Sequence, residues 1–239
     1  MGTYAAVVLA GGAARRMGGV DKPALPVGGR PMRDRVLAAV ADAAPRVLVG
    51  PADAVPDGVR VTREDPPGGG PVAATAAGLA LLDPGTTLVA LLAADLPLLT
   101  RAAIGELLTH LAPRGGTAHL APAGGTAHLA PAGGTAHLAP AGGTSPPAQE
   151  PDASLPDGAC FVDADGRRQS LCGVWRVAAL RAGLDRLAAE RGGTLAGAPV
   201  RALLADLVIR EVPWSGDGPP PWFDCDTDED VRRAEEWAR

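Results

Sequence analysis

Short apolar runs alternate with longer amphipathic segments along most of the chain. Runs rich in Val, Leu and Ala predict strands, whereas Ala/Leu-rich segments with helical spacing predict helices. The predicted strands are Tyr4–Ala10, Arg46–Val49, Val59–Thr62, Thr87–Ala93, Ala159–Asp163, Leu171–Arg176 and Val208–Val212. The predicted helices are Met32–Ala43, Val72–Leu82, Arg101–Leu111, Val177–Arg191, Val200–Leu207 and Asp228–Ala238. This order of elements predicts an α/β fold with a mostly parallel sheet covered by helices.

Two of the predicted helices begin with side chains suited to capping. Thr100 directly precedes the segment Arg101–Leu111, and Thr227 directly precedes the last helix. A Thr hydroxyl at this position accepts a hydrogen bond from a free backbone N–H of the first turn. Asp230 follows Thr227 by three positions, so this pair resembles a capping box, although Asp is a weaker partner there than Glu or Gln.

A repeat interrupts the alternation. The sequence HLAP occurs at His110–Pro113, His119–Pro122, His128–Pro131 and His137–Pro140, and GGTAHLAPA is copied three times at a nine-residue period. Residues 115–149 contain no Asp, Glu, Lys or Arg, and such a Gly/Pro-rich segment cannot bury enough side chain to offset its ordering entropy. We therefore expect one domain over residues 1–239 with a low-complexity insertion at about 114–156. All four histidines belong to the repeat, which argues against a catalytic histidine and, without further ligands nearby, against a metal site.

Composition and charge exclude several classes of protein. The chain of 239 residues has a formal net charge of −5 at pH 7, whereas general nucleic-acid and membrane-surface binders usually carry a basic excess. The sequence shows no secretory signal and no apolar run of roughly 18 residues, so we expect a cytoplasmic protein that binds neither nucleic acid nor membrane. Cys160, Cys172 and Cys225 lack CxxC spacing and are expected to be reduced thiols in the core.

The first predicted strand leads into a segment rich in glycine and basic residues. Leu9–Lys22 reads LAGGAARRMGGVDK, which matches neither the dinucleotide motif GxGxxG nor the ATP-binding motif GxxxxGK[ST]. Gly11 and Gly12 would let backbone N–H groups approach a triphosphate, and Arg16 and Lys22 would neutralise its oxygens. An ordinary glycine-rich turn with solvated cations is the alternative. The combination of strand, glycine pair and spaced cations favours a phosphate-binding loop.

An acidic residue follows the strand Thr87–Ala93. In the segment LLAADLPLLT, Asp95 comes after a run of apolar and small residues. Open α/β sheets place their ligands at the carboxyl ends of the strands. A carboxylate there is costly to bury unless it is paired, and Mg²⁺ is a suitable partner. Capping of the next helix is the alternative role for Asp95, but Thr100 is better placed for it.

Two further segments carry candidate site residues. Asp224 and Asp226 alternate in WFDCDTDEDV, so an extended backbone would put both on one face, within reach of an ion held by Asp95. The alternative, an acidic helix start that suits the helix dipole, accounts better for the acids that follow them. Asp65 lies at the entrance of REDPPGGGPVAATAAGL, a loop that could carry a flat base or an anion past backbone amides, or be a plain turn into a helix.

These segments resemble, in their order, the signature of the molybdenum cofactor guanylyltransferases, within the nucleotidyltransferase group that includes sugar-1-phosphate nucleotidyltransferases. LAGGAARRMGGVDK is the most specific match. EDPPGGGPVAA is similar to the family's ED…GPLAG segment, AADLPLL to its xxDxP segment, and FDCDTDEDV to its closing NxNTPEDL. The resemblance covers residues 1–112 and roughly 157–239, and the repeat stands between them as an insertion.

The resemblance implies a three-layer α/β/α sandwich with a Rossmann-like, mostly parallel sheet of the nucleotide-diphospho-sugar transferase type. It implies Mg²⁺-dependent transfer of GMP from GTP to molybdopterin or Mo-molybdopterin, with release of pyrophosphate, and partners among molybdoenzymes or cofactor-biosynthesis proteins. Carried over by position, the nucleotide-binding residues are Leu9, Ala10, Gly11, Gly12, Lys22, Asp65 and Asp95. The implied catalytic residues are Arg16, Lys22 and Asp95, and the implied metal ligands are Asp95 and Asp226.

The chain departs from the family pattern at three places. Gly50 stands where the family often carries Asn, DTDED replaces Thr-Pro-Glu, and Ser170 replaces Pro in RRQSLCGVW, a segment expected to line the pterin side. A cytidylyltransferase of the same pathway, a sugar-phosphate nucleotidyltransferase and a nucleotide-binding accessory protein without turnover are the alternatives. LAGG rather than LAAG resembles the guanine-using branch, and the presence of Lys22, Asp95 and Asp226 favours an enzyme.

Overall fold

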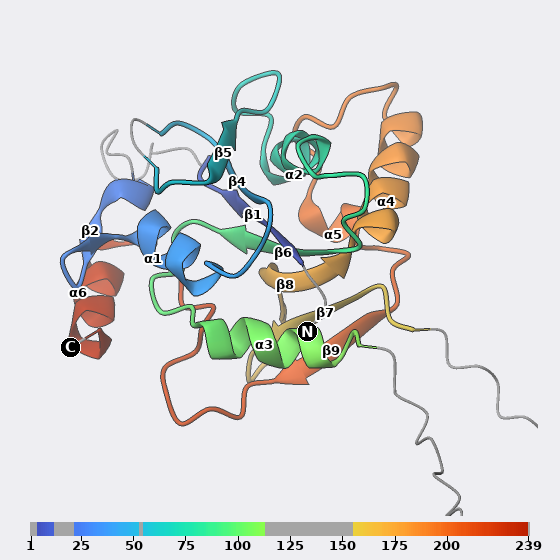
Figure 1. The fold of residues 1–239 in the computed structure, drawn as a ribbon. Coiled ribbons are helices and arrows are strands. Elements are labelled where there is room, and N and C mark those ends of the chain that lie inside the picture. Colours follow the sequence, from blue (N-terminus) through green and yellow to red (C-terminus); the bar gives the residue numbers. More distant parts are fainter. Residues whose placement is uncertain (1–3, 12–21, 53–54, 113–154, 239) are drawn as a thin grey trace, which may run out of the picture. The chain divides into compact units, whose positions relative to one another are not determined.

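The computed structural model describes residues 4–11, 22–52, 55–112 and 155–238. The strands of its main sheet are β1 (Ala5–Leu9), β4 (Arg46–Val49), β5 (Val59–Thr62), β6 (Leu88–Ala93), β7 (Gly158–Val162), β8 (Arg168–Arg176) and β9 (Ile209–Pro213). They lie in the order β5-β4-β1-β6-β8-β7-β9 (Figure 1). β8 runs antiparallel to its neighbours β6 and β7, and all other pairs in this sheet are parallel.

Helices cover both faces of the main sheet. They are α1 (Met32–Ala39), α2 (Pro71–Ala80), α3 (Arg101–Thr109), α4 (Val177–Glu190) and α5 (Val200–Leu203), whereas α6 (Asp228–Trp237) packs in a separate cluster with Val27 and Met32. Side chains of α1 and α3 share one buried cluster with the sheet, and those of α2, α4 and α5 share the other. The fold is therefore a three-layer α/β/α arrangement with a mostly parallel sheet, which confirms the predicted fold class.

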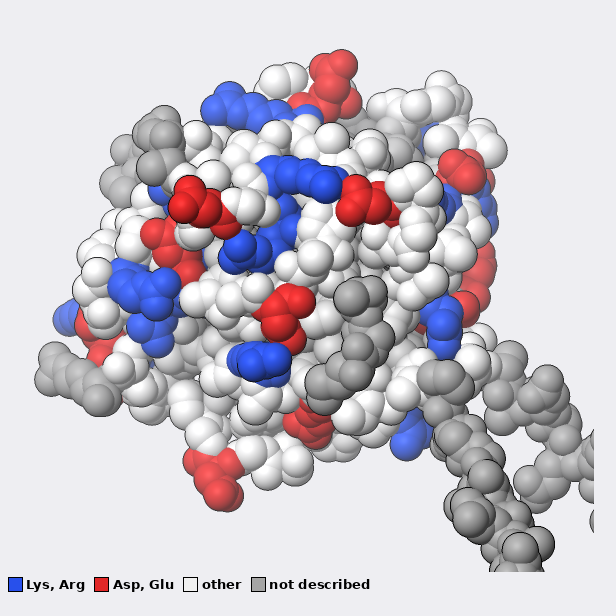
Figure 2. Space-filling view, in the orientation of Figure 1, with Lys and Arg blue, Asp and Glu red and all other residues white. Residues whose placement is uncertain are grey.

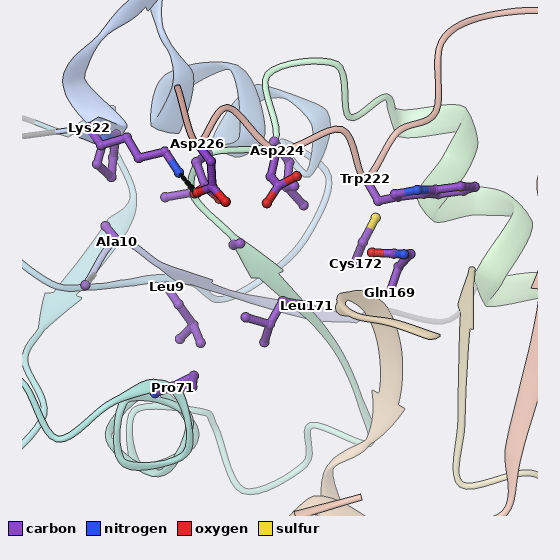
Figure 3. Close-up of a pocket in the computed structure, with 16 residues that line it drawn as sticks. Leu9, Ala10, Lys22, Pro71, Gln169, Leu171, Cys172, Trp222, Asp224 and Asp226 are labelled. Atoms are coloured by element: carbon purple, nitrogen blue, oxygen red, sulfur yellow. Dashed lines mark hydrogen bonds and ion pairs between the residues drawn. The ribbon is translucent and has the colours of Figure 1, made fainter. Parts of the chain in front are cut away.

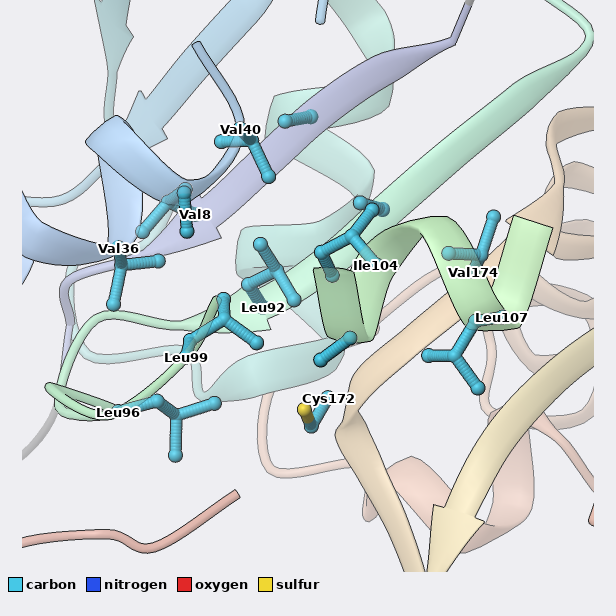
Figure 4. Close-up of a cluster of buried hydrophobic side chains, with 14 of the residues drawn as sticks. Val8, Val36, Val40, Leu92, Leu96, Leu99, Ile104, Leu107, Cys172 and Val174 are labelled. Atoms are coloured by element: carbon cyan, nitrogen blue, oxygen red, sulfur yellow. The ribbon is translucent and has the colours of Figure 1, made fainter. Parts of the chain in front are cut away.

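The central strand β1 shows why its sequence is apolar throughout. Ala6 and Val8 belong to the cluster on the α1 and α3 side, whereas Val7 and Leu9 belong to the cluster on the opposite side. All of β1 is buried, as expected of a parallel strand with helices on both faces. Figure 4 shows the first cluster, in which Val8 and Leu92 meet side chains of α1 and α3.

Element boundaries and one hairpin differ from the prediction. The first helix ends at Ala39 rather than Ala43, and β8 begins at Arg168 rather than Leu171. The antiparallel hairpin of β2 (Pro26–Val27) and β3 (Arg30–Pro31) is missing from the prediction, because strands of two residues are too short to show alternation. Gly28 and Gly29 form its turn with φ angles of 58° and 73°, which only glycine adopts without cost.

The C-terminal segment returns to the N-terminal half of the chain. The Cys225 N–H donates to the Asp95 carbonyl oxygen at 3.3 Å, and the Gly28 N–H donates to Glu235 of α6 at 3.0 Å. Thr227 and Asp230 form the predicted capping box at the start of α6, and Thr100 caps α3 as predicted. These contacts fasten the acidic C-terminal segment beside the end of β6.

The cysteines, the surface charges and the helix lengths of the described part can be compared with the predictions. The three cysteines are buried and free, as predicted. On the face shown in Figure 2, acidic and basic side chains are interspersed. None of the helices in the described ranges is long and apolar enough to span a membrane.

Contacts divide the chain into two units, residues 1–112 with 156–239 and residues 113–155. The GGTAHLAPA copies fall outside the described residues. Deleting Gly115–Gly142 is expected to leave the melting temperature and any activity nearly unchanged, because the first unit contains both sheets and loops tolerate changes in length. Thermal unfolding of both forms tests this; a fall of more than about 5 °C, roughly 1–2 kcal/mol at this chain length, would show that the repeat is structural.

Candidate functional site

A pocket of about 460 Å³ opens at the carboxyl ends of β1 and β6. Leu9, Ala10 and Gly11 at the end of β1 line it together with residues 93–96 at the end of β6. The start of β8 reaches the same edge because this strand is antiparallel to β6, with Cys172 paired to Leu92. The pocket therefore lies where open α/β sheets bind their ligands.

Lys22 joins two carboxylates inside this pocket. Its Nζ lies 2.7 Å from Asp95 Oδ2 and 2.6 Å from Asp226 Oδ1 (Figure 3). The Lys22 side chain is 19% exposed and Asp95 is 24% exposed, whereas Asp226 is 56% exposed. The cluster is thus partly shielded from solvent, and it joins segments that are 73 and 204 positions apart in the chain.

The local backbone explains how Asp226 reaches Lys22. Asp230 of α6 accepts hydrogen bonds from the backbone N–H groups of Asp226 and Thr227, at 3.1 and 2.8 Å. The capping box therefore orients the backbone just before α6. Together with the bond from the Cys225 N–H to Asp95, it holds the Asp226 carboxylate beside the end of β6.

The electrostatics of the cluster follow from burial and close charges. Burial alone would lower the pKa of Lys22, but the hydrogen bonds and charges of Asp226 and Asp95 outweigh it and raise the pKa. Partial burial and the nearby charges of Asp226 and Asp95 raise the pKa of Asp224, which also lines the pocket. Three carboxyl groups thus share the described wall of the pocket with one ammonium, so a further cation would relieve repulsion among them.

The arrangement of carboxylates is compatible with Mg²⁺. Mg²⁺ is usually held by one or two protein carboxylates together with substrate phosphates and water. Asp95 and Asp226 converge on a single ammonium, which stands where a cation between two carboxylates would lie. Within the described ranges, no group of three or more His, Cys, Asp or Glu side chains is suited to hold a metal alone. These two carboxylates therefore fit a metal shared with a phosphate ligand.

The structure brings most of the predicted site residues together. Leu9, Ala10, Gly11, Lys22, Asp95 and Asp226 all line the one pocket. Gly12 and Arg16 fall outside the described residues.

Asp65 is placed differently from the other predicted site residues. It is exposed and does not line the pocket. Its neighbour Glu64 is buried, accepts the Gly68 N–H at 3.0 Å and lies against Gly11. The chain direction after β5 therefore turns Glu64, and not Asp65, toward the loop that follows β1.

Several lining residues are not among the individually predicted site residues, although the family resemblance implies that the segment RRQSLCGVW lines the pterin side. Gln169, Leu171 and Cys172 come from β8, Trp222 precedes the acidic segment, and Pro71 begins α2. A tryptophan or an alternating strand residue is usually part of the core, so these positions could not be singled out from their residue types. The N-terminus of α2 at Pro71 adds partial positive charge beside the pocket.

Gly50 packs directly against the loop after β1. Its φ angle is 140°, and a Cβ there would lie 2.8 Å from the carbonyl carbon of Ala10 and 3.0 Å from the nitrogen of Gly11. A larger residue would have to displace the backbone that lines the pocket. Gly50 stands where the family often carries Asn, and in this chain the backbone of Ala10 and Gly11 leaves no room there for a side chain.

Replacing Gly50 with alanine is expected to lower the free energy of unfolding by about 1–3 kcal/mol, because the new Cβ meets backbone at a strained φ. Gly85→Ala is the matched control, since a Cβ at Gly85 meets nothing within 4 Å. Denaturant unfolding of both variants measures the difference. Equal stability of the two variants would show that the Ala10–Gly11 backbone yields without cost.

Comparisons with known proteins agree with this fold. A family model described as the MobA-like NTP transferase domain matches residues 6–208. Molybdopterin-guanine dinucleotide biosynthesis protein A from Archaeoglobus fulgidus has a TM-score of 0.58 at 18% identity, covering 97% of this chain and 97% of that one. The 2-C-methyl-D-erythritol 4-phosphate cytidylyltransferase from Thermus thermophilus has a TM-score of 0.59 at 17% identity, covering 99% and 98%.

A third solved structure, 4-diphosphocytidyl-2C-methyl-D-erythritol synthase from Anaerococcus prevotii, has a TM-score of 0.59 at 13% identity and covers 98% of this chain and 97% of that one. A search of curated protein sequences finds no match. The fold and the matched family model together define an α/β protein of the nucleotidyltransferase class. The chain belongs to the MobA-like NTP transferase domain family, whose model matches most of the length of this chain.

Proposed function

We propose that this chain is a Mg²⁺-dependent nucleotidyltransferase that transfers GMP from GTP to molybdopterin, as one domain with the repeat inserted. The observation that carries the proposal is the meeting of Lys22, Asp95 and Asp226 at the ends of β1 and β6. It supplies a cation and two carboxylates at the place where such sheets bind nucleotides. The sequence motif from Leu9 to Lys22 supports GTP as the donor and molybdopterin as the acceptor.

The proposed reaction is a substitution at phosphorus. An oxygen of the acceptor's terminal phosphate attacks the α-phosphorus of GTP and forms a new P–O bond. The bond from the α-phosphorus to the oxygen that bridges the α- and β-phosphates breaks, and pyrophosphate leaves with its electron pair. The attacking oxygen is already ionised at neutral pH, so no side chain has to remove a proton.

The protein's part in this reaction is positioning and charge neutralisation. Lys22 would turn from its carboxylate partners to the phosphate oxygens, while the backbone of Leu9–Gly11 would border the nucleotide. Asp95 and Asp226 would hold Mg²⁺, which supplies neutralisation of phosphate charge when bound. Gly12 and Arg16 would complete the phosphate-binding loop by their positions in the motif.

Nucleotide-resolved turnover tests the proposal. Purified protein with Mg²⁺ is incubated with GTP, CTP or ATP, each with molybdopterin or with 2-C-methyl-D-erythritol 4-phosphate, and pyrophosphate release is followed. Release that requires both GTP and molybdopterin is the expected result. Release from CTP with the erythritol phosphate would replace the substrates while keeping the reaction, and GTP binding without release from any pair would indicate an accessory protein.

A further inference from the structure

The pocket continues beyond the charged cluster to a wall without charge. We call Gln169, Leu171, Cys172 and Trp222 the neutral wall, since all four line the pocket and none carries a charge. Burial raises the pKa of the Cys172 thiol, which keeps this side chain neutral as well. Figure 3 shows Trp222, Cys172 and Gln169 at the end of the view opposite Lys22, Leu9 and Ala10. A ligand group bound there would leave the phosphate-binding residues free.

Trp222 packs against the aromatic ring of Phe161. The ring of Phe161, a fully buried residue of β7, lies 5.4 Å from the Trp222 ring with an angle of 33° between the planes. Trp214 packs edge-on against Phe161 at 5.5 Å. The indole is therefore anchored to the sheet through Phe161 and still lines the pocket. A fixed indole is suited to stacking, because little side-chain entropy is lost when a ring binds to it.

Gln169 adds a hydrogen-bond acceptor to the same wall. Its Nε2 donates to Asp163 Oδ2 at 3.1 Å and to the Arg167 carbonyl oxygen at 3.4 Å. With both amide N–H groups engaged, the group that Gln169 can offer a ligand is its carbonyl oxygen Oε1, an acceptor. The neutral wall thus offers an aromatic ring and an acceptor for an N–H, which suits a flat heterocycle better than a polyol.

We propose that Trp222 is the platform on which a planar nitrogen heterocycle of the acceptor stacks, with Gln169 Oε1 accepting a hydrogen bond from a ring N–H. The inference rests on the proposed function, because it takes the acceptor, and not the nucleotide base, to lie at this end. The nucleotide is assigned to the side of Leu9–Gly11, so the acceptor phosphate has to enter the cluster from the side of Trp222.

Binding of free pterin to the full-length chain tests this assignment. Pterin is the probe because it carries the ring and its N–H groups without the phosphate. The Trp222→Leu variant is expected to bind pterin about 10-fold or more weakly, the loss typical of one removed stacking partner. Trp222→Phe should recover part of this loss, since it keeps an aromatic face. Trp237→Leu, which removes a tryptophan 39% exposed on α6, is the matched control.

A second variant and a second ligand keep the outcomes distinct. Gln169→Met leaves Trp222 and Phe161 in place and is expected to weaken pterin binding several-fold, because it removes only the acceptor. The affinity for Mg²⁺·GTP should stay unchanged in Trp222→Leu and in Gln169→Met. A parallel loss of Mg²⁺·GTP affinity in Trp222→Leu would instead place the guanine base on the indole and overturn the proposal.

The remaining outcomes are also decisive. No pterin binding by the unaltered chain, or equal binding by Trp222→Leu and Trp237→Leu, would overturn the role of Trp222. Pterin binding that depends on Trp222 in a chain that releases no pyrophosphate from GTP and molybdopterin would support the ring platform while the proposed transfer reaction fails. The two proposals therefore fail on different measurements.

Discussion

Replacing Lys22 with alanine is expected to lower the rate of pyrophosphate release about 10²-fold or more, the usual cost of losing one preorganised charge-stabilising group. The ammonium lies 2.7 Å from Asp95 and 2.6 Å from Asp226, so the variant removes the cation that bridges these two carboxylates. Steady-state kinetics with GTP and the acceptor measure the loss. Unchanged kinetics would remove Lys22 from the mechanism.

The choice of lysine at this position supports a specific role. Lys22 is the only lysine in the sequence, and every other residue among the 22 Lys and Arg is arginine. An ammonium is a compact point charge that fits between two carboxylates, whereas a guanidinium is a planar fork. Lys22→Arg is therefore expected to restore only a small part of the rate lost in Lys22→Ala. Arg210→Ala, at an exposed residue of β9, is the control for loss of one positive charge elsewhere.

The pocket-forming strand ends could be predicted from local sequence. β1 and β6, whose ends line the pocket, are short apolar runs, whereas β4 and β5 beside them mix Val and Leu with Arg and Thr. The predicted and observed bounds of these four strands differ by at most one residue at either end. Lys22 and Asp95 could be singled out because a segment rich in glycine and basic residues follows β1 and an acid follows β6. Whether a residue lies just after a parallel strand, where such sheets bind ligands, can be read from the neighbouring sequence.

The meeting of distant segments could not be predicted in this way. Asp226 reaches Lys22 across 204 positions, and its path depends on the capping box and on one backbone hydrogen bond to Asp95. The antiparallel direction of β8 brings Gln169 to the same edge, and only the family resemblance of its segment, not its strand pattern, points there. Glu64, and not Asp65, faces Gly11 after β1, because of the local direction of the backbone after β5. Each of these is a tertiary effect without a local signature.

Replacing Trp175 with alanine is expected to lower the free energy of unfolding by about 3–5 kcal/mol, as for other fully buried aromatic residues. Trp175 is fully buried on β8, where it packs in the cluster formed with α2, α4 and α5. At this chain length each kcal/mol corresponds to about 2–4 °C in melting temperature. Thermal and denaturant unfolding should therefore both show a large fall.

Two glycines make room for this indole and explain why the loss should be large. Gly158 of β7 is paired directly with Trp175. Gly173 lies on β8 itself, two positions before Trp175. A Cβ at Gly158 would overlap Cε3 of the indole, and one at Gly173 would lie 2.9 Å from Cζ2. Neither glycine has a side chain that could fill the cavity left by Trp175→Ala, so the site can collapse only by moving backbone.

Two further variants separate the loss of volume from the loss of the indole nitrogen. Trp175 Nε1 is buried without a hydrogen-bond partner in the described part of the chain, so Trp175→Phe removes an unsatisfied donor together with part of the ring. Its cost should be clearly smaller than that of Trp175→Ala. Trp237→Ala, at a partly exposed tryptophan that contacts Phe223 and Arg233, should cost about 1 kcal/mol or less. A Trp175→Ala variant as stable as Trp237→Ala would show that the core refills around the two glycines, against the packing argued from their contacts.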